Sequence, residues 1–140
     1  MTAWRLDTGP LLAALNRRDP DHSRCVAALT TFSGSLLTTG AVVAEAMHFL
    51  AGRPGTTETR IGFLDDAPVD IRDCFAPLQL HAATRLMKKY ADTPMDFADA
   101  TLVLRADETG CNHIVTLDER GFRTFRFRNT RRFLLVLPPP

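Results

Sequence analysis

The sequence has few cysteines and no closely spaced cysteine pair. Its three cysteines, Cys25, Cys74 and Cys111, are far apart and odd in number. This spacing excludes a zinc site built on CxxC pairs and the disulfide framework of a small secreted protein. Cys111 and His113 offer only two ligands, which cannot complete a tetrahedral zinc site. We therefore expect all three cysteines to be reduced residues of the core.

Long apolar runs are also missing. No stretch approaches the roughly 18 apolar residues needed to span a bilayer, and the start MTAWRLD has no basic segment followed by an apolar run and a cleavage site. We expect a cytoplasmic protein without a membrane segment. The net charge of +1 says little about partners, because a whole-chain sum hides local patches.

The composition is that of an ordinary folded chain. Hydrophobic residues make up 45% and charged residues 24% of the 140 residues, which excludes a disordered chain. This length matches one domain and leaves no room for a second module. The expected unit is therefore a single domain, residues 1–140.

Apolar segments separated by glycine, proline and polar residues alternate between two periodicities. Strands are expected at 2–6, 35–38, 69–71, 113–116 and 133–137. Helices are expected at 10–15, 22–32, 41–50, 56–65, 78–90 and 93–110, the last with Pro94 in its first turn. Alternating strands and helices predict an α/β fold with three layers, α/β/α, around a central and mainly parallel sheet.

The segment 78–90 shows the pattern of an amphipathic helix. The apolar side chains expected on its buried face are Leu78, Ala82, Leu86 and Tyr90. Arg85, Lys88 and Lys89 lie elsewhere around the cylinder and are expected in solvent.

Five acidic residues fall where such a sheet places a functional site. Asp7 and Asp118 follow expected strands, and the carboxyl ends of parallel strands meet at one edge. Asp96 and Asp99 are one helical turn apart and share a helix face. Glu45 lies in an alanine-rich helix that can pack closely against the sheet edge. We expect these side chains to converge.

Converging carboxylates point to metal chemistry. Asp96 and Asp99 repel each other in an apolar helix unless a cation neutralises them, and burial increases that cost. Mg²⁺ and Mn²⁺ prefer oxygen ligands, so acids without His or Cys fit them better than zinc. Such ions activate water and stabilise charge on a phosphate, which predicts phosphodiester hydrolysis. The histidines are scattered and indicate no catalytic triad.

Each acid also has a structural explanation. The segment 93–96 resembles a capping box in which Asp96 faces a helix N-terminus. Asp118 can cap a short helix at 119–122, and Asp7 can cap the helix that follows it. Glu45 can face solvent. The functional hypothesis therefore rests on the joint placement of the acids.

Two enzyme classes share part of the first motif. Residues 6–9 spell LDTG, the tetrapeptide of aspartic proteases, but that fold is all-β and a helical run follows here. A phosphatase of the haloacid dehalogenase type needs a second aspartate two residues after the first, where this chain has Gly9. Both classes are set aside.

Four segments resemble the PIN-domain ribonucleases, particularly the toxin subunits of VapBC toxin–antitoxin pairs. The segments are LDTGPLLAALNRRDPDH (6–22), AVVAEAMHFL (41–50), PMDFADATLVLRADETG (94–110) and HIVTLDERGF (113–122). The resemblance covers nearly the whole chain and rests on the order, spacing and acids of these segments together.

The resemblance implies an acidic metal site that contains Asp7, Glu45, Asp99 and Asp118. Asp96 is an added acid found in a subset with a PMDxADA segment, and whether Asp96 or Asp99 is the closer ligand stays open.

Two hydroxyl residues flank these acids. Thr116 matches a position where the family commonly keeps a hydroxyl, placed to hold a metal-bound water or a phosphate oxygen. Thr8 either orients Asp7 or satisfies a turn.

The resemblance also implies activity and partners. It implies an active Mg²⁺- or Mn²⁺-dependent endoribonuclease that cuts structured RNA, forms a homodimer and is inhibited by a VapB-type antitoxin in a type II toxin–antitoxin system. The alternatives are a housekeeping PIN nuclease and a non-catalytic PIN-like scaffold that binds RNA or protein.

The segment 120–133 is rich in arginine and phenylalanine. One hypothesis is an RNA-binding surface, with arginines on phosphates and phenylalanines stacked on bases. The other is an edge strand with arginines outward and phenylalanines inward, and both can hold together. The residues are Arg120, Arg123, Arg126, Arg128, Arg131 and Arg132, with Phe122, Phe125 and Phe127 between them.

Overall fold

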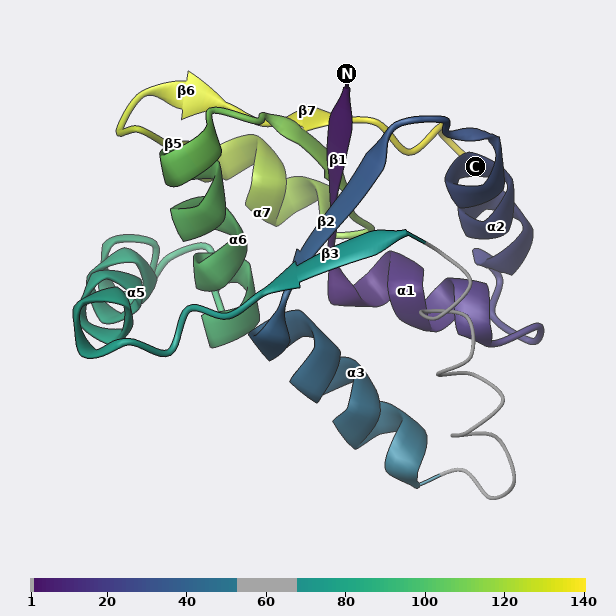
Figure 1. The fold of residues 1–140 in the computed structure, drawn as a ribbon, viewed down its shortest axis with the longest axis horizontal. Coiled ribbons are helices and arrows are strands. Elements are labelled where there is room, and N and C mark those ends of the chain that lie inside the picture. The colour runs from purple at the N-terminus through teal and green to yellow at the C-terminus, as the bar shows by residue number, and fades with distance from the viewer. Residues whose placement is uncertain (1, 53–67) are drawn as a thin grey trace.

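The sheet at the centre of the molecule is parallel. The computed structural model describes residues 2–52 and 68–140, and its five-stranded sheet has the order β3-β2-β1-β4-β7 (Figure 1). Because the strands run in one direction, their carboxyl ends meet at one edge. The strands are β1 (Ala3–Leu6), β2 (Ser35–Thr39), β3 (Val69–Arg72), β4 (His113–Val115) and β7 (Leu134–Leu135).

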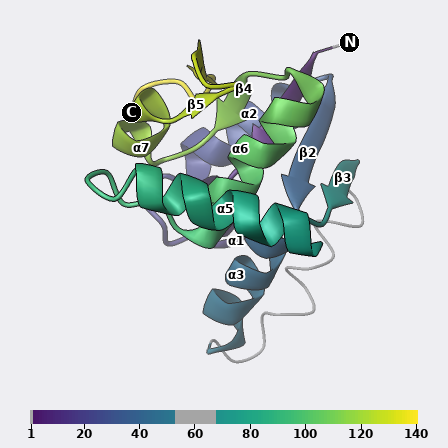
Figure 2. The same cartoon turned by 90° about the vertical axis from the view of Figure 1, so that its left-hand side faces the viewer.

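Helices lie on both faces of this sheet. Figures 1 and 2 show α3 projecting from the carboxyl edge, with α6 and α7 on the opposite side of the sheet from α1 and α2. The helices are α1 (Thr8–Leu15), α2 (His22–Thr31), α3 (Gly40–Ala51), α5 (Pro77–Lys89), α6 (Phe97–Thr109) and α7 (Glu119–Thr124). No helix in the described ranges is long and apolar enough to cross a membrane.

The hydrophobic core consists of two clusters, because the side chains of each strand alternate between the two faces of the sheet. In β4, Ile114 packs with α5, α6 and α7, whereas Val115 packs with α1 and α2. Leu6 of β1 joins the α1–α2 cluster. Successive side chains of a strand point to opposite faces, so each strand serves both clusters. The expected three-layer α/β/α architecture with a parallel sheet is confirmed.

The start of α6 and the extent of the last strand differ from the expectations. α6 begins at Phe97, with Asp96 as its N-cap, so Pro94 precedes the helix and is not in its first turn. The last strand is only Leu134–Leu135, shorter than the expected 133–137. The expected helix at 56–65 lies outside the described residues.

The buried face of α5 is also displaced from the expected one. Leu78 is 84% exposed, so its assignment to the core was wrong. α5 buries Ala83 and packs Leu86, Met87 and Tyr90 against the α6–α7 cluster. The first turn of α5 lies beyond this contact, so the apolar side chain of Leu78 is exposed.

The phenylalanines between 120 and 133 are core residues. Phe122, Phe125 and Phe127 are fully buried and form edge or tilted ring contacts with one another or with Phe133. The hypothesis that they stack on RNA bases was therefore wrong, and their inward orientation is confirmed. The segment forms α7 and an antiparallel hairpin of β5 (Arg126–Phe127) and β6 (Arg131–Arg132), not one edge strand.

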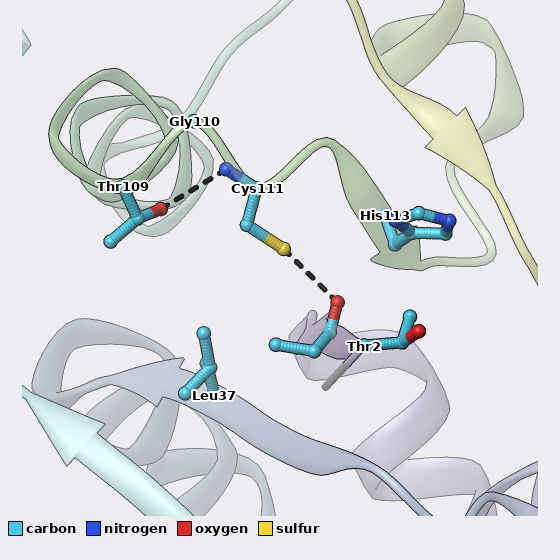
Figure 3. A pocket seen from close by; sticks show the side chains of 7 residues that line it. Thr2, Leu37, Thr109, Gly110, Cys111 and His113 are labelled. Carbon is cyan, nitrogen blue, oxygen red and sulfur yellow. Dashed lines mark hydrogen bonds between the residues drawn. The ribbon is translucent and has the colours of Figure 1, made fainter.

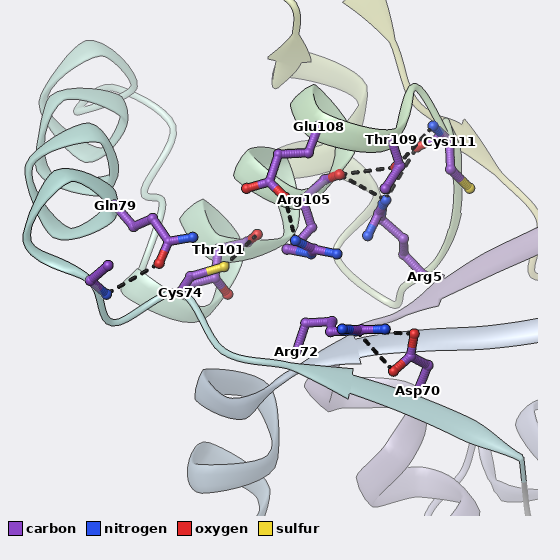
Figure 4. A network of polar contacts seen from close by, with 11 residues as sticks. Arg5, Asp70, Arg72, Cys74, Gln79, Thr101, Arg105, Glu108, Thr109 and Cys111 are labelled. Atoms are coloured by element: carbon purple, nitrogen blue, oxygen red, sulfur yellow. Dashed lines mark hydrogen bonds and ion pairs between the residues drawn. The ribbon is translucent and has the colours of Figure 1, made fainter.

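The buried side chain of Arg5 on β1 forms hydrogen bonds with the end of α6. Arg5 is 1% exposed, and Figure 4 shows its guanidinium directed at the last turn of α6. Its nitrogens donate to the carbonyl oxygen of Arg105 at 2.9 Å, to the carbonyl oxygen of Cys111 at 3.4 Å and to the hydroxyl of Thr109. A cation is favourable at a helix C-terminus, where the carbonyl groups carry partial negative charge.

Candidate functional site

Asp7 lies directly after β1 and is almost completely buried, at 7% exposure. Its Oδ1 accepts a hydrogen bond from the backbone N–H of Thr8 at 2.8 Å, and its Oδ2 accepts one from the hydroxyl of Thr116 at 2.7 Å. Burial raises the pKa of Asp7 to about 6, although both hydrogen bonds oppose the rise. The charges of Asp96 and Glu45 raise it further.

Asp96 and Asp99 form a reciprocal capping box at the start of α6. The N–H of Asp99 donates to Oδ1 of Asp96 at 2.8 Å, and the N–H of Asp96 donates to Oδ2 of Asp99 at 3.2 Å. Asp99 is 9% exposed, whereas Asp96 is exposed. Burial raises the pKa of Asp99 to about 8, with further increases from the charges of Asp7, Asp96 and Asp118.

Glu45 reaches the same region from α3. Burial and then the charge of Asp96 raise the pKa of Glu45. The Thr8 hydroxyl is buried and has no partner at hydrogen-bonding geometry within the described ranges, although it faces Glu45 closely enough to lower the pKa of that carboxyl. A buried polar atom without a partner is costly, and it marks a place where a further ligand is accommodated.

Thr116 connects Asp7 to the turn that carries Asp118. The hydroxyl of Thr116 accepts a hydrogen bond from the N–H of Asp118 at 2.9 Å while it donates to Asp7. Asp118 is exposed and caps α7, accepting a hydrogen bond from the N–H of Gly121 at 3.0 Å. The predicted capping roles of Asp7 and Asp118 are thus confirmed, whereas the capping box lies at 96–99, with Asp96 as its N-cap, and not at the expected 93–96.

The five acids share one electrostatic environment. Asp7 and Asp99 lie buried at its centre, and the other three surround them, since each raises the pKa of one or both. None of the ion pairs within residues 2–52 and 68–140 involves these acids. In the same ranges, no three His, Cys, Asp or Glu side chains are arranged as direct ligands of one ion.

These residues fit a hard divalent cation. Every donor is an oxygen, and burial together with neighbouring negative charges makes the two central carboxyls resist ionisation, an effect that a bound cation would offset. The unpartnered hydroxyl of Thr8 adds a further oxygen beside them. Mg²⁺ and Mn²⁺ retain several waters, so they can be held by a few carboxylates. Asp7 and Asp99 would hold such an ion, with Glu45, Asp96 and Asp118 around them.

A separate cavity opens at the other edge of the sheet. It has a volume of about 430 Å³ and is lined by Thr2, Ala3, Leu37, Thr109, Gly110, Cys111 and His113 (Figure 3). Cys111 donates its thiol proton to the carbonyl oxygen of Ala3 at 3.0 Å across this cavity. Since Ala3 and His113 begin their strands, this cavity is remote from the acids and does not belong to their site.

Comparison with known proteins agrees with this architecture. Fold and site together define an α/β protein with an acidic site at the carboxyl ends of its strands. A model described as the PIN domain matches residues 5–128. The chain therefore belongs to the PIN domain family.

Two relatives were found in Mycobacterium tuberculosis. Ribonuclease VapC26 is 29% identical over 134 residues, which cover 94% of this chain and 98% of that protein. The crystal structure of VapC20, described as a sarcin-ricin loop cleaving toxin, superposes with a TM-score of 0.79 and 18% identity and covers 96% of this chain and 99% of that one. At this identity the second match shows a shared fold.

Proposed function

We propose that this protein is an endoribonuclease that depends on a divalent metal ion, Mg²⁺ or Mn²⁺, held by Asp7, Glu45, Asp96, Asp99 and Asp118. The observation that carries the proposal is the gathering of these acids from four separate segments without a lysine or arginine partner within the described ranges. Membership of the PIN family and similarity to a protein named Ribonuclease VapC26 support it.

The residues have distinct tasks in this proposal. A bound ion supplies an activated water near neutral pH and stabilises negative charge on the phosphate. Asp7 and Asp99 form the buried floor, and Asp96 and Asp118 face solvent, where RNA approaches. Thr116 holds Asp7 through its hydroxyl. Its proton is committed to Asp7, which makes it a positioning residue for this carboxylate, and its second lone pair stays available to the metal-bound water that the family resemblance implies.

The test is cleavage of total cellular RNA by the purified protein with Mg²⁺, with Mn²⁺ and with EDTA. Cleavage is expected with either metal and not with EDTA. Asp99→Asn should abolish it because the buried charge is lost, whereas Asp92→Asn, the same change at an exposed acid, should leave it intact. A non-catalytic scaffold would give no metal-dependent product with any of the three proteins.

We further propose that the protein is the cytoplasmic toxin of a type II toxin–antitoxin pair, acting as a homodimer and inhibited by a VapB-type antitoxin. The match to VapC26 over almost the full length of both chains supports this role. Induced expression should arrest growth, and Asp99→Asn should not. A housekeeping nuclease would be tolerated at the same expression level, with no small inhibitory protein encoded beside it.

A further inference from the structure

The six arginines between 120 and 132 differ in what their guanidinium groups contact. The guanidinium of Arg126 donates to the carbonyl oxygens of residues 123, 124 and 125 at 2.7 to 3.1 Å. Arg128 donates from Nε to the carbonyl oxygen of Asp107 at 2.9 Å. These contacts hold the end of α7 and the hairpin in place, and they engage Nη1 of Arg126 and Nε of Arg128.

Other arginines in the segment have free donors. Arg120 and Arg132 are exposed, and their guanidinium groups have no hydrogen-bond or ion-pair partner in the part of the chain that the structure describes. Arg123 is exposed and reaches only Glu119, at 3.7 Å. Exposed pairs of this length contribute little free energy, so Arg123 can exchange its partner for another anion.

α7 places two of these free arginines next to the acids. Asp118 caps α7, and Arg120 follows it by two residues on the same short helix, with Arg123 one turn further on. Both side chains are exposed, as is Asp118. Positive charge is thus present on the same short helix that Asp118, an exposed acid of the site, caps.

The end of α5 extends this positive surface. The hydroxyl of Tyr90, which follows α5, accepts a hydrogen bond from the N–H of Arg126 at 3.0 Å, and its ring meets that of Phe125 at 5.1 Å. Figure 2 shows α7 beside this end of α5. Lys88 and Lys89, both exposed, therefore lie on the same side of the molecule as α7.

Arg132 lies at the opposite end of α6. The hairpin is fixed there because the N–H of Arg128 donates to Oδ1 of Asp107 at 2.5 Å. Asp107 follows Asp96 by eleven residues, which corresponds to about 16 Å along a helix axis. Arg132 is thus equally exposed and equally unpartnered within the described residues, but remote from the acids.

We propose that Lys88, Lys89, Arg120 and Arg123 form a phosphate-binding strip that holds the RNA backbone against the acid site. This inference rests on the proposed function. RNA must approach a pocket of five carboxylates, and adjacent cations offset that repulsion. Because Phe122 and Phe125 are buried, they offer no aromatic platform for bases. The strip contacts phosphates without reading the sequence.

The test measures binding of a labelled single-stranded RNA by the Asp99→Asn protein across a series of salt concentrations. Adding Arg120→Gln, or Lys88→Gln with Lys89→Gln, should weaken binding about two- to fivefold per residue at low salt. Each lost phosphate contact should also reduce the slope of log affinity against log salt by about 0.7. Arg132→Gln is the matched control and should change neither quantity.

Three results would overturn the strip. One is a loss of RNA affinity in Arg132→Gln that equals the loss in Arg120→Gln. Another is unchanged RNA affinity in both Arg120→Gln and the variant with Lys88→Gln and Lys89→Gln. The third is unchanged RNA binding with lost binding of poly-glutamate, which would assign the strip to an acidic protein. If instead the wild-type protein fails to cut RNA with metal while the strip variants still lose RNA affinity, the nuclease proposal fails and the strip stands.

Discussion

The hydroxyl of Thr116 donates a 2.7 Å hydrogen bond to Oδ2 of Asp7 and accepts one of 2.9 Å from the N–H of Asp118. Thr116 is thus hydrogen-bonded to two acidic residues that are far apart in the sequence. The bond to Asp7 favours its ionised form and opposes the effect of burial. Thr116 is therefore a positioning residue that keeps Asp7 ionisable near neutral pH.

Thr116→Val should raise the pKa of Asp7 above its value of about 6. A hydrogen bond to a charged group contributes about 1.5 kcal/mol or more, which corresponds to roughly one pKa unit. Metal binding needs the ionised carboxylate, so the acid limb of the pH–rate profile should move upward by about one unit. Thr116→Ser keeps the hydroxyl and should keep the profile. Identical profiles for the Val and Ser variants would contradict this role.

The buried acids should destabilise the metal-free protein as pH rises. Folded-state pKa values of about 6 for Asp7 and about 8 for Asp99 exceed the ordinary value of 3.8. The folded state therefore binds more protons than the unfolded state, and stability is lost as pH rises from about 4 towards 8. Asp99→Asn should remove much of this loss and raise the unfolding free energy at pH 8 by about 2–4 kcal/mol.

Urea unfolding between pH 5 and pH 8, with and without Mg²⁺, measures this effect. The gain from Asp99→Asn should grow with pH, and Mg²⁺ should stabilise the wild-type protein much more than the variant. Asp92→Asn, which removes an exposed charge, should follow the wild type. A pH-independent difference between the Asp99→Asn variant and the wild type would show that Asp99 carries no burial penalty.

The sequence predicted the ends of helices and strands best where a local pattern of residues is compatible with only one structure. β1 is followed at once by Asp7, and that juncture was visible because Gly9 and Pro10 mark a turn into a helix. The start of α6 was ambiguous because Pro94 and Asp96 are both starting signals. The structure selects Asp96, since Asp99 three residues later completes the capping box.

Packing between elements determines which side chains are buried where the periodicity of the sequence allows more than one arrangement. Leu78 has the right spacing for the buried face of α5, but α6 does not extend over the first turn of that helix. The alternation of phenylalanine and arginine around Phe125 is compatible with an exposed RNA-binding surface and equally with phenylalanines buried in the core. Arg5 gave no signal, because its partners at the end of α6 are about a hundred residues away. The capping hydrogen bonds of Asp7 and Asp118 were predictable from the sequence, whereas the hydrogen bond from Thr116 to Asp7 was not.

Gly121 is a further residue of the site that the sequence did not reveal. A Cβ on Gly121 would overlap the carboxylate of Asp118, lying 2.8 Å from its Cγ, and would meet the ring of Phe125 at 3.0 Å. Gly121→Ala should therefore displace Asp118 from its capping position. We expect a loss of about 1–3 kcal/mol in unfolding free energy and reduced cleavage by protein that is still folded.

Gly52→Ala is the control for that substitution, because a Cβ there meets no atom within 4 Å in the described structure. Circular dichroism and RNA cleavage at one metal concentration compare the two variants. Full activity of the Gly121→Ala variant would mean that Asp118 needs no fixed position.

Arg5→Met should destabilise the protein more than any exposed arginine substitution. It removes the donor shared by the carbonyl oxygen of Arg105 and the hydroxyl of Thr109, and with it the contact to the carbonyl oxygen of Cys111. Because the carbonyl oxygen of Arg105 still accepts a hydrogen bond from Thr109, the expected loss is that of hydrogen bonds to a charged group, about 1.5–3 kcal/mol. Arg5→Lys keeps the charge but cannot reach three acceptors in the geometry of a guanidinium, so it should recover only part.

Arg72→Met provides the comparison that isolates burial. Arg72 pairs with Asp70 at 3.1 Å on the exposed surface of β3 (Figure 4), and such pairs contribute about 0–1 kcal/mol. Arg5 lies on β1, two residues before Asp7, and its side chain contacts the end of α6, the helix that carries Asp99. Arg5→Met should therefore also weaken Mg²⁺-dependent stabilisation, which Arg72→Met should leave unchanged. Equal losses in the two variants would mean that the C-terminus of α6 needs no anchor on β1.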